Sequence, residues 1–368
     1  MELRDTIKSF PRTLVGFFAA GPPDRRNAGP PKAKSAPSGD EPGLGAVPAD
    51  CAEPGESERL ASREVDSKPK AQRGGFFLFC FVDVLMSHLI LQGPRLDGAI
   101  IEKIAALVQA DGVQELGPTA VRLLGADTGQ QEQVQALCQT GRMDFAFLNQ
   151  IDRLKDMRVL AMDMDSTLIN IECIDEIADM AGRKEQVATI TEAAMRGEIK
   201  DFSESLVRRV AFLEGVAIDD LTRVYEERLQ PNPGAERLVA TAHAHGVKTL
   251  LVSGGFTFFT ERMKDRLSLS YAHSNTLEVV DGVLTGKVLG AIVDGQAKAR
   301  FLQQLAAELG AGPEQCIAMG DGANDLPMMA QAVYSVAYRA KPVVQEQARF
   351  ALNHSPLDAV LNWFRLDV

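Results

Sequence analysis

The fold is decided by the stretch Val159-Leu160-Ala161-Met162-Asp163-Met164-Asp165-Ser166-Thr167, in which an apolar run ends in two carboxylates. A short apolar run bounded by charge is typical of a buried strand in a parallel sheet. Because side chains alternate along a strand, Asp163 and Asp165 lean to the same side where the strand ends. Two anions held together are costly unless a cation or a shared proton relieves the repulsion. The pair is therefore a candidate site, at the strand edge where open α/β sheets bind ligands.

Strand and helix patterns alternate from Arg158 onward. Strands are predicted over residues 158–162, 247–252, 316–319, 333–337 and 349–352. Helices are predicted between them, over residues 234–243, 257–266 and 297–309. This alternation predicts an α/β fold with a doubly wound, Rossmann-like parallel sheet, whose strand ends lie along one edge. Asp281-Gly282, between β-rich runs at 275–280 and 283–285, predicts an antiparallel hairpin that extends the sheet.

The chain divides into three predicted parts. Residues 1–85 are rich in Pro, Gly, Ser and charge, and they are predicted to be a disordered or low-complexity extension. The pattern that follows also supports the hypothesis that translation begins at Met86. Residues 86–150 predict a small α/β domain, compatible with an ACT-like unit and without a catalytic constellation. Residues 151–368 predict the main domain, and the helical insertion at about 173–231 is placed to act as a cap.

Composition excludes several classes of partner. The 368 residues carry a net charge of -11, which argues against binding to nucleic acid or to an anionic membrane surface. No apolar run reaches the ~20 residues that a membrane span needs. The five cysteines, at positions 51, 80, 138, 173 and 316, lack zinc-binding spacing and are interpreted as reduced packing residues. We therefore expect a cytoplasmic protein with a small-molecule substrate; the sequence is also compatible with a homodimer.

Three further polar motifs are predicted at the same edge of the sheet. Ser253-Gly254-Gly255 offers a hydroxyl and exposed backbone N–H groups that can cradle an anion. Lys298 lies in the first turn of the helix that begins near Gln296. Gly320-Asp321-Gly322-Ala323-Asn324-Asp325 places carboxylates and an amide in a tight turn. Each motif is common by itself, and the glycines do not complete a dinucleotide fingerprint.

Taken together, the motifs resemble those of the haloacid dehalogenase-like phosphatases. The order is Asp-x-Asp-x-Thr, Ser-Gly-Gly, Lys, and Gly-Asp-Gly-x-Asn-Asp. Within this superfamily, the segment from Asp163 to Leu168, Glu172 and Ser253-Gly254-Gly255-Phe256 are similar to the members that act on phosphoserine. The resemblance covers about residues 158–353. It implies hydrolysis of O-phospho-L-serine to L-serine and phosphate, the last step of serine biosynthesis.

The resemblance also implies catalytic and metal-binding roles. Asp163 would attack phosphorus and form an aspartyl-phosphate, while Asp165 would protonate the departing serine oxygen and then activate water. Neighbouring Asp163 and Asp321 are expected to raise the pKa of Asp165. Mg²⁺ would be held by Asp163, the backbone carbonyl of Asp165, and Asp321. Asp325 would shape the surroundings of the metal.

The resemblance implies one set of residues for the phosphate and another set for the serine part of the substrate. Ser253, the Gly254 amide and Lys298 would bind phosphoryl oxygens, and Asn324 would line the same site. Glu172 would bind the substrate amino group, and Arg209 its carboxylate, since arginine suits bidentate carboxylate binding. Without the resemblance, the residues alone favour Glu172 as a solvated acid near a helix start, and Arg209 as a solvated helix residue like Arg208.

Two alternatives stay open. One is a related phosphotransferase, or a phosphatase that acts on another small phosphate monoester. The other is a binding or regulatory protein that keeps the fold without catalysis. The complete set of reacting groups argues against the second alternative, and it comprises Asp163, Asp165, Ser253, Lys298 and Asp321.

Overall fold

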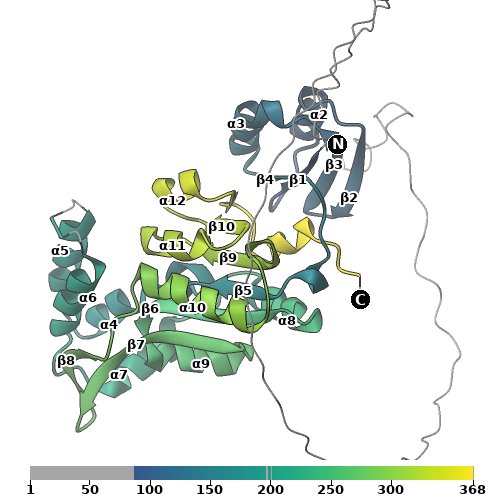
Figure 1. Cartoon of the computed structure of the whole chain (residues 1–368). Helices are drawn as coiled ribbons and strands as arrows, with labels where there is room; N and C mark the ends of the chain where they lie inside the picture. Colours follow the sequence, from purple (N-terminus) through teal and green to yellow (C-terminus); the bar gives the residue numbers. More distant parts are fainter. Residues whose placement is uncertain (1–86, 196–197, 200, 368) are drawn as a thin grey trace, which may run out of the picture. The chain divides into compact units, whose positions relative to one another are not determined.

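The computed structural model describes residues 87–195, 198–199 and 201–367. The predictions of a disordered extension over residues 1–85 and of a start at Met86 lie outside the described residues. No helix within the described ranges is long and apolar enough to span a bilayer. The described residues contain two sheets, one of four strands and one of seven (Figure 1).

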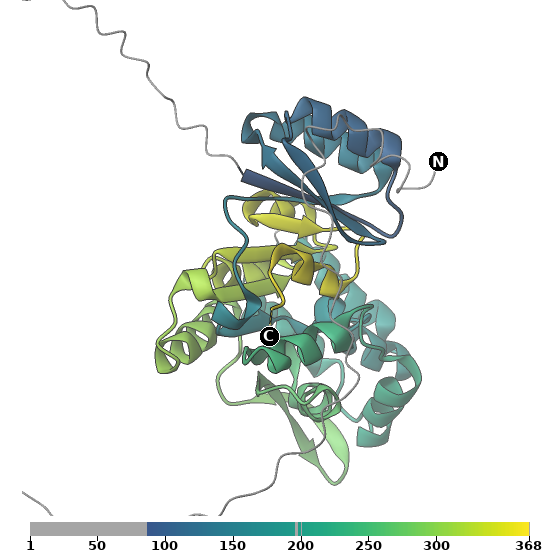
Figure 2. The same ribbon diagram turned by 90° about the vertical axis from the view of Figure 1, so that its right-hand side faces the viewer.

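The four-stranded sheet has the order β2-β3-β1-β4, and all its neighbours pair antiparallel. Its elements are β1 (Ser87–Gln92), α2 (Gly98–Leu107), β2 (Gly112–Gly117), β3 (Ala120–Ala126), α3 (Gln131–Gly141) and β4 (Asp144–Leu148). The two blue helices cover one face of the sheet in Figure 2. Leu89 and Leu91 on β1 pack in one cluster with Ile101 and Ile104 of α2. The polar pair Gln114-Glu115 interrupts the apolar pattern of β2.

The seven-stranded sheet has the order β11-β10-β9-β5-β6-β7-β8. Its strands are β5 (Val159–Met162), β6 (Lys248–Phe256), β7 (Tyr271–Val280), β8 (Val283–Leu289), β9 (Cys316–Gly320), β10 (Tyr334–Tyr338) and β11 (Phe350–Leu352). All neighbours pair parallel except β7 and β8. This confirms the predicted doubly wound sheet. The strand order reverses at β5, so the two acids follow the strand where such sheets bind ligands.

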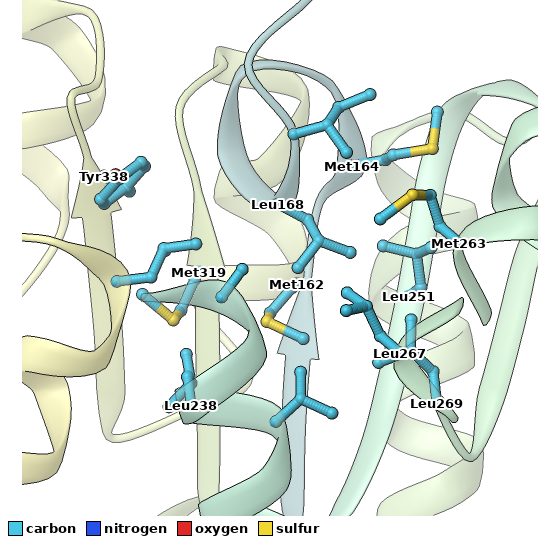
Figure 3. Close-up of a cluster of buried hydrophobic side chains, with 14 of the residues drawn as sticks. Met162, Met164, Leu168, Leu238, Leu251, Met263, Leu267, Leu269, Met319 and Tyr338 are labelled. Carbon is cyan, nitrogen blue, oxygen red and sulfur yellow. The ribbon is translucent and has the colours of Figure 1, made fainter. Parts of the chain in front are cut away.

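Helices cover both faces of this sheet, which explains the continuous apolar run in β5. They are α8 (Ala235–Ala244), α9 (Thr257–Leu267), α10 (Gly295–Glu308), α11 (Leu326–Met329) and α12 (Pro342–Gln347). Leu160 and Met162 point to the face covered by α8 and α9, where Met162 lies near Leu251 and Met319 (Figure 3). Val159 and Ala161 belong to the cluster on the opposite face, with residues of α10 and α11.

A helical insertion separates β5 from β6. It contains α4 (Cys173–Met180), α5 (Lys184–Met195), α6 (Phe202–Ala211) and α7 (Ile218–Arg223), followed by one wide turn over Val224–Arg228. In Figure 1, α6 lies beside β8, and the backbone N–H of Gly215 donates to the carbonyl of Leu284. The insertion is therefore supported by the hairpin of β7 and β8.

This hairpin is longer than the sequence predicted. The first residues of β7, from Tyr271, pair parallel with β6, and its later residues pair antiparallel with β8. One strand therefore belongs to the parallel sheet and to the hairpin. The alternating apolar and polar residues at 275–280 indicated only the part that pairs antiparallel with β8.

Candidate active site

The loop that follows β5 carries the paired acids. The backbone N–H of Asp163 donates to the carbonyl of Met319 at 3.0 Å, so pairing with β9 extends one residue past the strand. A wide turn over Met164–Leu168 follows, in which the N–H of Ile169 donates to the carbonyl of Met164 at 3.0 Å. The side-chain amide of Asn232 donates to the carbonyls of Thr167 at 2.8 Å and of Ile169 at 2.9 Å. Asn232 is thus a positioning residue that the sequence analysis missed, because it lies more than 60 positions away.

A buried lysine ties two strand ends together. Lys298 is 0% exposed, and its Nζ donates to Asp163 Oδ1 and, at 2.7 Å, to Asp325 Oδ1. The other oxygen of Asp325 accepts the N–H of Gly322 at 3.0 Å. Burial opposes the charged form of Lys298, but the two carboxylates outweigh it and raise its pKa. The lysine is therefore protonated, and removing either carboxylate would leave buried charge poorly paired.

Three carboxylates gather around this lysine. Oxygen atoms of Asp163, Asp321 and Asp325 lie within 4.8 Å of one another. Burial, followed by the charge of Asp325, raises the pKa of Asp321 to about 7 and also raises that of Asp163. Thr167 Oγ1 donates to Asp321 Oδ1 at 3.3 Å. Hard, negatively charged oxygen ligands that repel one another fit a divalent cation, which would favour their ionised forms.

The carboxylate cluster and the predicted metal site share Asp163 and Asp321, but they differ at Asp165 and Asp325. Asp325, which the sequence analysis placed only in the surroundings, is a member of the cluster. The carboxylate of Asp165 is not a member, and the prediction for Asp165 concerned its backbone carbonyl. Lys298 lies against Asp163 and Asp325, so it also balances part of the cluster's charge.

Asp165 is held at the start of the insertion. Its Oδ1 accepts the backbone N–H of Cys173 at 3.2 Å, in the first turn of α4. Burial raises the pKa of Asp165 to about 7, and the charge of Glu172 adds to the shift. The sequence analysis attributed this shift to Asp163 and Asp321, whereas Glu172 is the leading charged contributor. A carboxyl group with a pKa near neutrality is suited to both donating and accepting a proton.

The Ser-Gly-Gly motif ends β6 directly beside Asp165. Ser253 is fully buried, and its Oγ accepts the N–H of Gly255 at 2.8 Å. A Cβ atom on Gly255 would lie only 2.8 Å from Asp165 Oδ2, so this position requires glycine. The side-chain amide of Asn275 donates to the carbonyl of Gly254 at 2.8 Å and fixes the segment. The sequence did not identify Asn275, whose place in β7 gave no signal of this contact.

A cavity of about 740 Å³ joins these groups to the insertion. The structure brings most of the predicted site residues to its wall, namely Asp163, Asp165, Glu172, Arg209, Gly254, Asp321 and Asn324. Lys298 and Ser253 are fully buried and are not among the wall residues. On the insertion side, Phe202 lies so close to Gly254 that a Cβ there would be 2.7 Å from the ring. The insertion therefore contacts the Ser-Gly-Gly motif and contributes residues to the lining of the cavity.

Arg209 brings positive charge to the insertion side of the cavity. Burial lowers the pKa of its guanidinium group, and the charges of Asp175 and Glu172 partly oppose that shift. Its Nε donates to the carbonyl of Ser205 at 3.4 Å, one turn earlier in α6. The guanidinium is thus held at the wall by its own helix and by nearby acids, and it can meet an anionic group in the cavity.

Comparison with known proteins agrees with this geometry. Residues 160–330 match the haloacid dehalogenase-like hydrolase family, and residues 89–134 match a domain family of unknown function. A phosphoserine phosphatase of a Polaromonas species is 57% identical over 213 residues, which are 57% of this chain and 90% of that protein.

Comparison with solved structures also finds similarity to phosphoserine phosphatases. The chain resembles an unliganded probable phosphoserine phosphatase from Vibrio cholerae, with 38% identity and a TM-score of 0.67 over 79% of this chain and 90% of that one. It also resembles a phosphoserine phosphatase described as a phospho-aspartyl intermediate analogue, with 37% identity and a TM-score of 0.53 over 57% and 99% of the two chains. The chain therefore belongs to the haloacid dehalogenase-like hydrolases and, within them, to the phosphoserine phosphatase family.

Proposed function

We propose that the chain hydrolyses O-phospho-L-serine to L-serine and phosphate, with Asp163 as the nucleophile. One observation carries this proposal: a single cavity is lined by Asp163 and Asp321 of the carboxylate cluster and also by Glu172 and Arg209. The carboxylate cluster, once it holds a cation, suits a phosphoryl group. Glu172 suits an ammonium group, and Arg209 suits a carboxylate. Phosphoserine has all three groups within a small molecule.

The first chemical step forms an aspartyl-phosphate. An oxygen of Asp163 attacks phosphorus as the bond from phosphorus to the serine oxygen breaks. Lys298 holds Asp163 in one orientation and balances charge as a fixed cation. The proposed metal is Mg²⁺, held by Asp163, Asp321 and the backbone carbonyl of Asp165, with Asp325 nearby; when bound, it neutralises phosphoryl charge.

Asp165 serves both chemical steps. In the first step its protonated form donates a proton to the departing serine oxygen. In the second step its carboxylate takes a proton from the water that attacks phosphorus, and the Asp163 carboxylate leaves. The N–H of Cys173 fixes one oxygen of Asp165, which keeps the other free for proton transfer. The pKa of about 7 lets the same group play both parts near neutral pH.

The insertion supplies the recognition of serine. Glu172 receives the ammonium group and Arg209 the carboxylate, while Gly254 and Asn324 line the cavity around the phosphoryl group. Ser253 lies buried behind them, where its Oγ accepts the N–H of Gly255. Phe202, which lies over Gly254, keeps water from the reacting atoms when the insertion is closed. Binding energy from the serine part thus positions the phosphorus beside Asp163.

The test is a panel of phosphate monoesters assayed with Mg²⁺ for released phosphate. Phosphoserine is expected to have the highest kcat/KM, by at least about tenfold over esters that lack an amino or carboxylate group. Equal rates across the panel would contradict the assignment of substrate. Phosphoryl transfer to an added alcohol, in place of phosphate release, would show a phosphotransferase instead.

We also propose a cytoplasmic location for the enzyme. Cys138, Cys173 and Cys316 are buried with free thiols, as expected in a reducing compartment. Fractionation of cells that produce the native protein would test this. The homodimer stays a prediction, which sedimentation of the purified protein would decide.

A further inference from the structure

We propose that Ser166 is a positioning residue for the amino group of the substrate, and that it acts through Glu172. This role rests on the proposed function, because it requires a substrate that carries an ammonium group beside its phosphate. Ser166 would not touch the reacting atoms. It would hold the Glu172 carboxylate where the ammonium group binds.

The contact between the two side chains is short and direct. Ser166 Oγ donates a hydrogen bond to Glu172 Oε1 at 2.6 Å. The backbone N–H of Ser166 also donates to the carbonyl of Ile171 at 3.1 Å. Both Ser166 and Glu172 lie on the wall of the cavity. The serine is therefore tied twice to the segment that presents Glu172.

The backbone conformation at Ser166 is one that favours glycine. Its φ of 55° and ψ of -5° lie in the left-handed region, where glycine is preferred because it has no Cβ. Six non-glycine residues in the described part of the chain have positive φ, and of these Ser166 alone is on the cavity wall. A strained residue at a site points to a function for its side chain. Here the side chain donates its hydrogen bond to Glu172.

The hydrogen bond leaves Glu172 able to bind a cation. A carboxylate offers about four lone-pair positions, and the hydroxyl of Ser166 takes one of them. Glu172 is exposed and makes no capping bond to its own helix. Without Ser166, its side chain would lose rotamer freedom when the substrate binds, which weakens binding. With Ser166, most of that ordering is complete before the substrate arrives.

The test compares Ser166→Gly with the wild type on three substrates. They are phosphoserine, O-phosphoethanolamine, which lacks the carboxylate, and the phosphate ester of 3-hydroxypropionate, which lacks the amino group. Glycine suits the local backbone, so the variant is expected to fold. We expect KM to rise about tenfold, equivalent to ~1.4 kcal/mol, for the two substrates with an amino group. For these substrates kcat should change less than about twofold, and KM for the third substrate should stay within about twofold.

A matched control is Ser268→Gly. Ser268 has a φ of 56°, is exposed, and lies at the end of α9 outside the cavity wall. The substitution relieves the same backbone strain without touching the site, so its kinetics should match the wild type. A second control places Ser166→Gly in a Glu172→Gln background. There the serine substitution should change KM for phosphoserine by less than about twofold, because its partner has lost its charge.

Two results would overturn the role of Ser166 alone. An equal loss on all three substrates would mean that Ser166 shapes the loop of Asp163 and Asp165. Unchanged KM values on all three would mean that the contact with Glu172 has no part in binding. A third result would overturn the proposed function and this role together: a wild-type enzyme that hydrolyses the ester without an amino group as efficiently as phosphoserine. This result comes from assays of the wild-type enzyme alone, so it is distinguished from any effect of the Ser166 substitution.

Discussion

The two walls of the cavity are built in different ways. On the sheet side, Asp163 lines the cavity and accepts a hydrogen bond from Lys298, which lies buried behind it and also bonds to buried Asp325. On the insertion side, Glu172 is exposed, and the Arg209 guanidinium donates to the Ser205 carbonyl of its own helix over 3.4 Å. Buried charge fixes the first wall tightly, because any unpaired member would be costly. On the insertion side Glu172 is held by its bond from Ser166, whereas Arg209 is held by the longer bond to its own helix and can adjust to a substrate.

The difference predicts two classes of variant. Changes on the sheet side should lower kcat for every phosphate monoester, because all of them use the same phosphoryl chemistry. Changes on the insertion side should raise KM only for substrates that carry the matching group. The experiments below test this division, beginning with the largest expected effect.

Asp163→Asn should abolish turnover on every substrate. The amide cannot form a phosphoenzyme, so kcat should fall by about 10⁴-fold or more. The side chain keeps its size, and Lys298 keeps its partner Asp325. The protein should therefore remain folded. The measurement is phosphate release in a steady-state assay, with exposed Asp265 changed to Asn as a control. Substantial activity in Asp163→Asn would remove this residue as the nucleophile.

Removal of divalent metal should also act on all substrates alike. A chelator is expected to reduce kcat/KM by at least about 100-fold, since the carboxylate cluster would then repel the phosphoryl oxygens. Added Mg²⁺ should restore activity and raise the Tm of the wild type. The same addition should not raise the Tm of Asp321→Asn to a similar extent. Full activity in chelator would contradict the assignment of the carboxylate cluster as a metal site.

Arg209→Ala should divide the substrates by their carboxylate. KM for phosphoserine should rise about 50-fold, because loss of a charged hydrogen-bonding partner is costly for a buried anion. KM for O-phosphoethanolamine should change little. Arg208 is the matched control, because it pairs with Glu204 on the surface of the same helix. Equal effects of Arg208→Ala and Arg209→Ala would leave Arg209 without a part in recognition.

The same division explains how far the sequence could predict the molecule. The apolar runs around Leu160, Leu250 and Ile317 identified buried parallel strands, because burial on both faces removes polar residues from a strand. The reacting groups were visible because each directly follows a strand or begins a helix. Each of these patterns can be recognised within a few consecutive residues of the sequence.

The missing parts depend on contacts between distant segments. Asn232 bonds to the loop after Asp163, and Asn275 bonds to Gly254, yet neither asparagine has a local pattern that reveals its partner. The leading charged contributor to the Asp165 pKa shift, Glu172, was also not identified. Its contribution depends on how closely Glu172 approaches once the chain folds, and spacing along the sequence does not give that distance.

Gly254→Ala tests whether the two walls must touch. The new methyl group would lie about 2.7 Å from the ring of Phe202, so the ring or the whole insertion must move. We expect kcat/KM for phosphoserine to fall about tenfold, because a displaced insertion admits water and misplaces Arg209. Phe202→Leu in the same chain should recover part of the loss by making room. Failure of that second substitution to help would place the defect in the Ser-Gly-Gly segment itself rather than in its contact with Phe202.

The smallest expected effect is the pH dependence of stability in the metal-free protein. The pKa values of Asp165 and Asp321 are raised to about 7 in the folded protein, against ~3.9 in an unfolded chain. Between about pH 4 and pH 7 the folded state therefore binds more protons, and the free energy of unfolding falls as pH rises. The Tm should drop by a few degrees from pH 5 to pH 8. Mg²⁺ should recover most of this loss at pH 8, because it stabilises the ionised carboxylates. In Asp321→Asn the drop should be smaller, and a drop equal to that of the wild type would mean that the sheet-side wall does not carry this proton uptake.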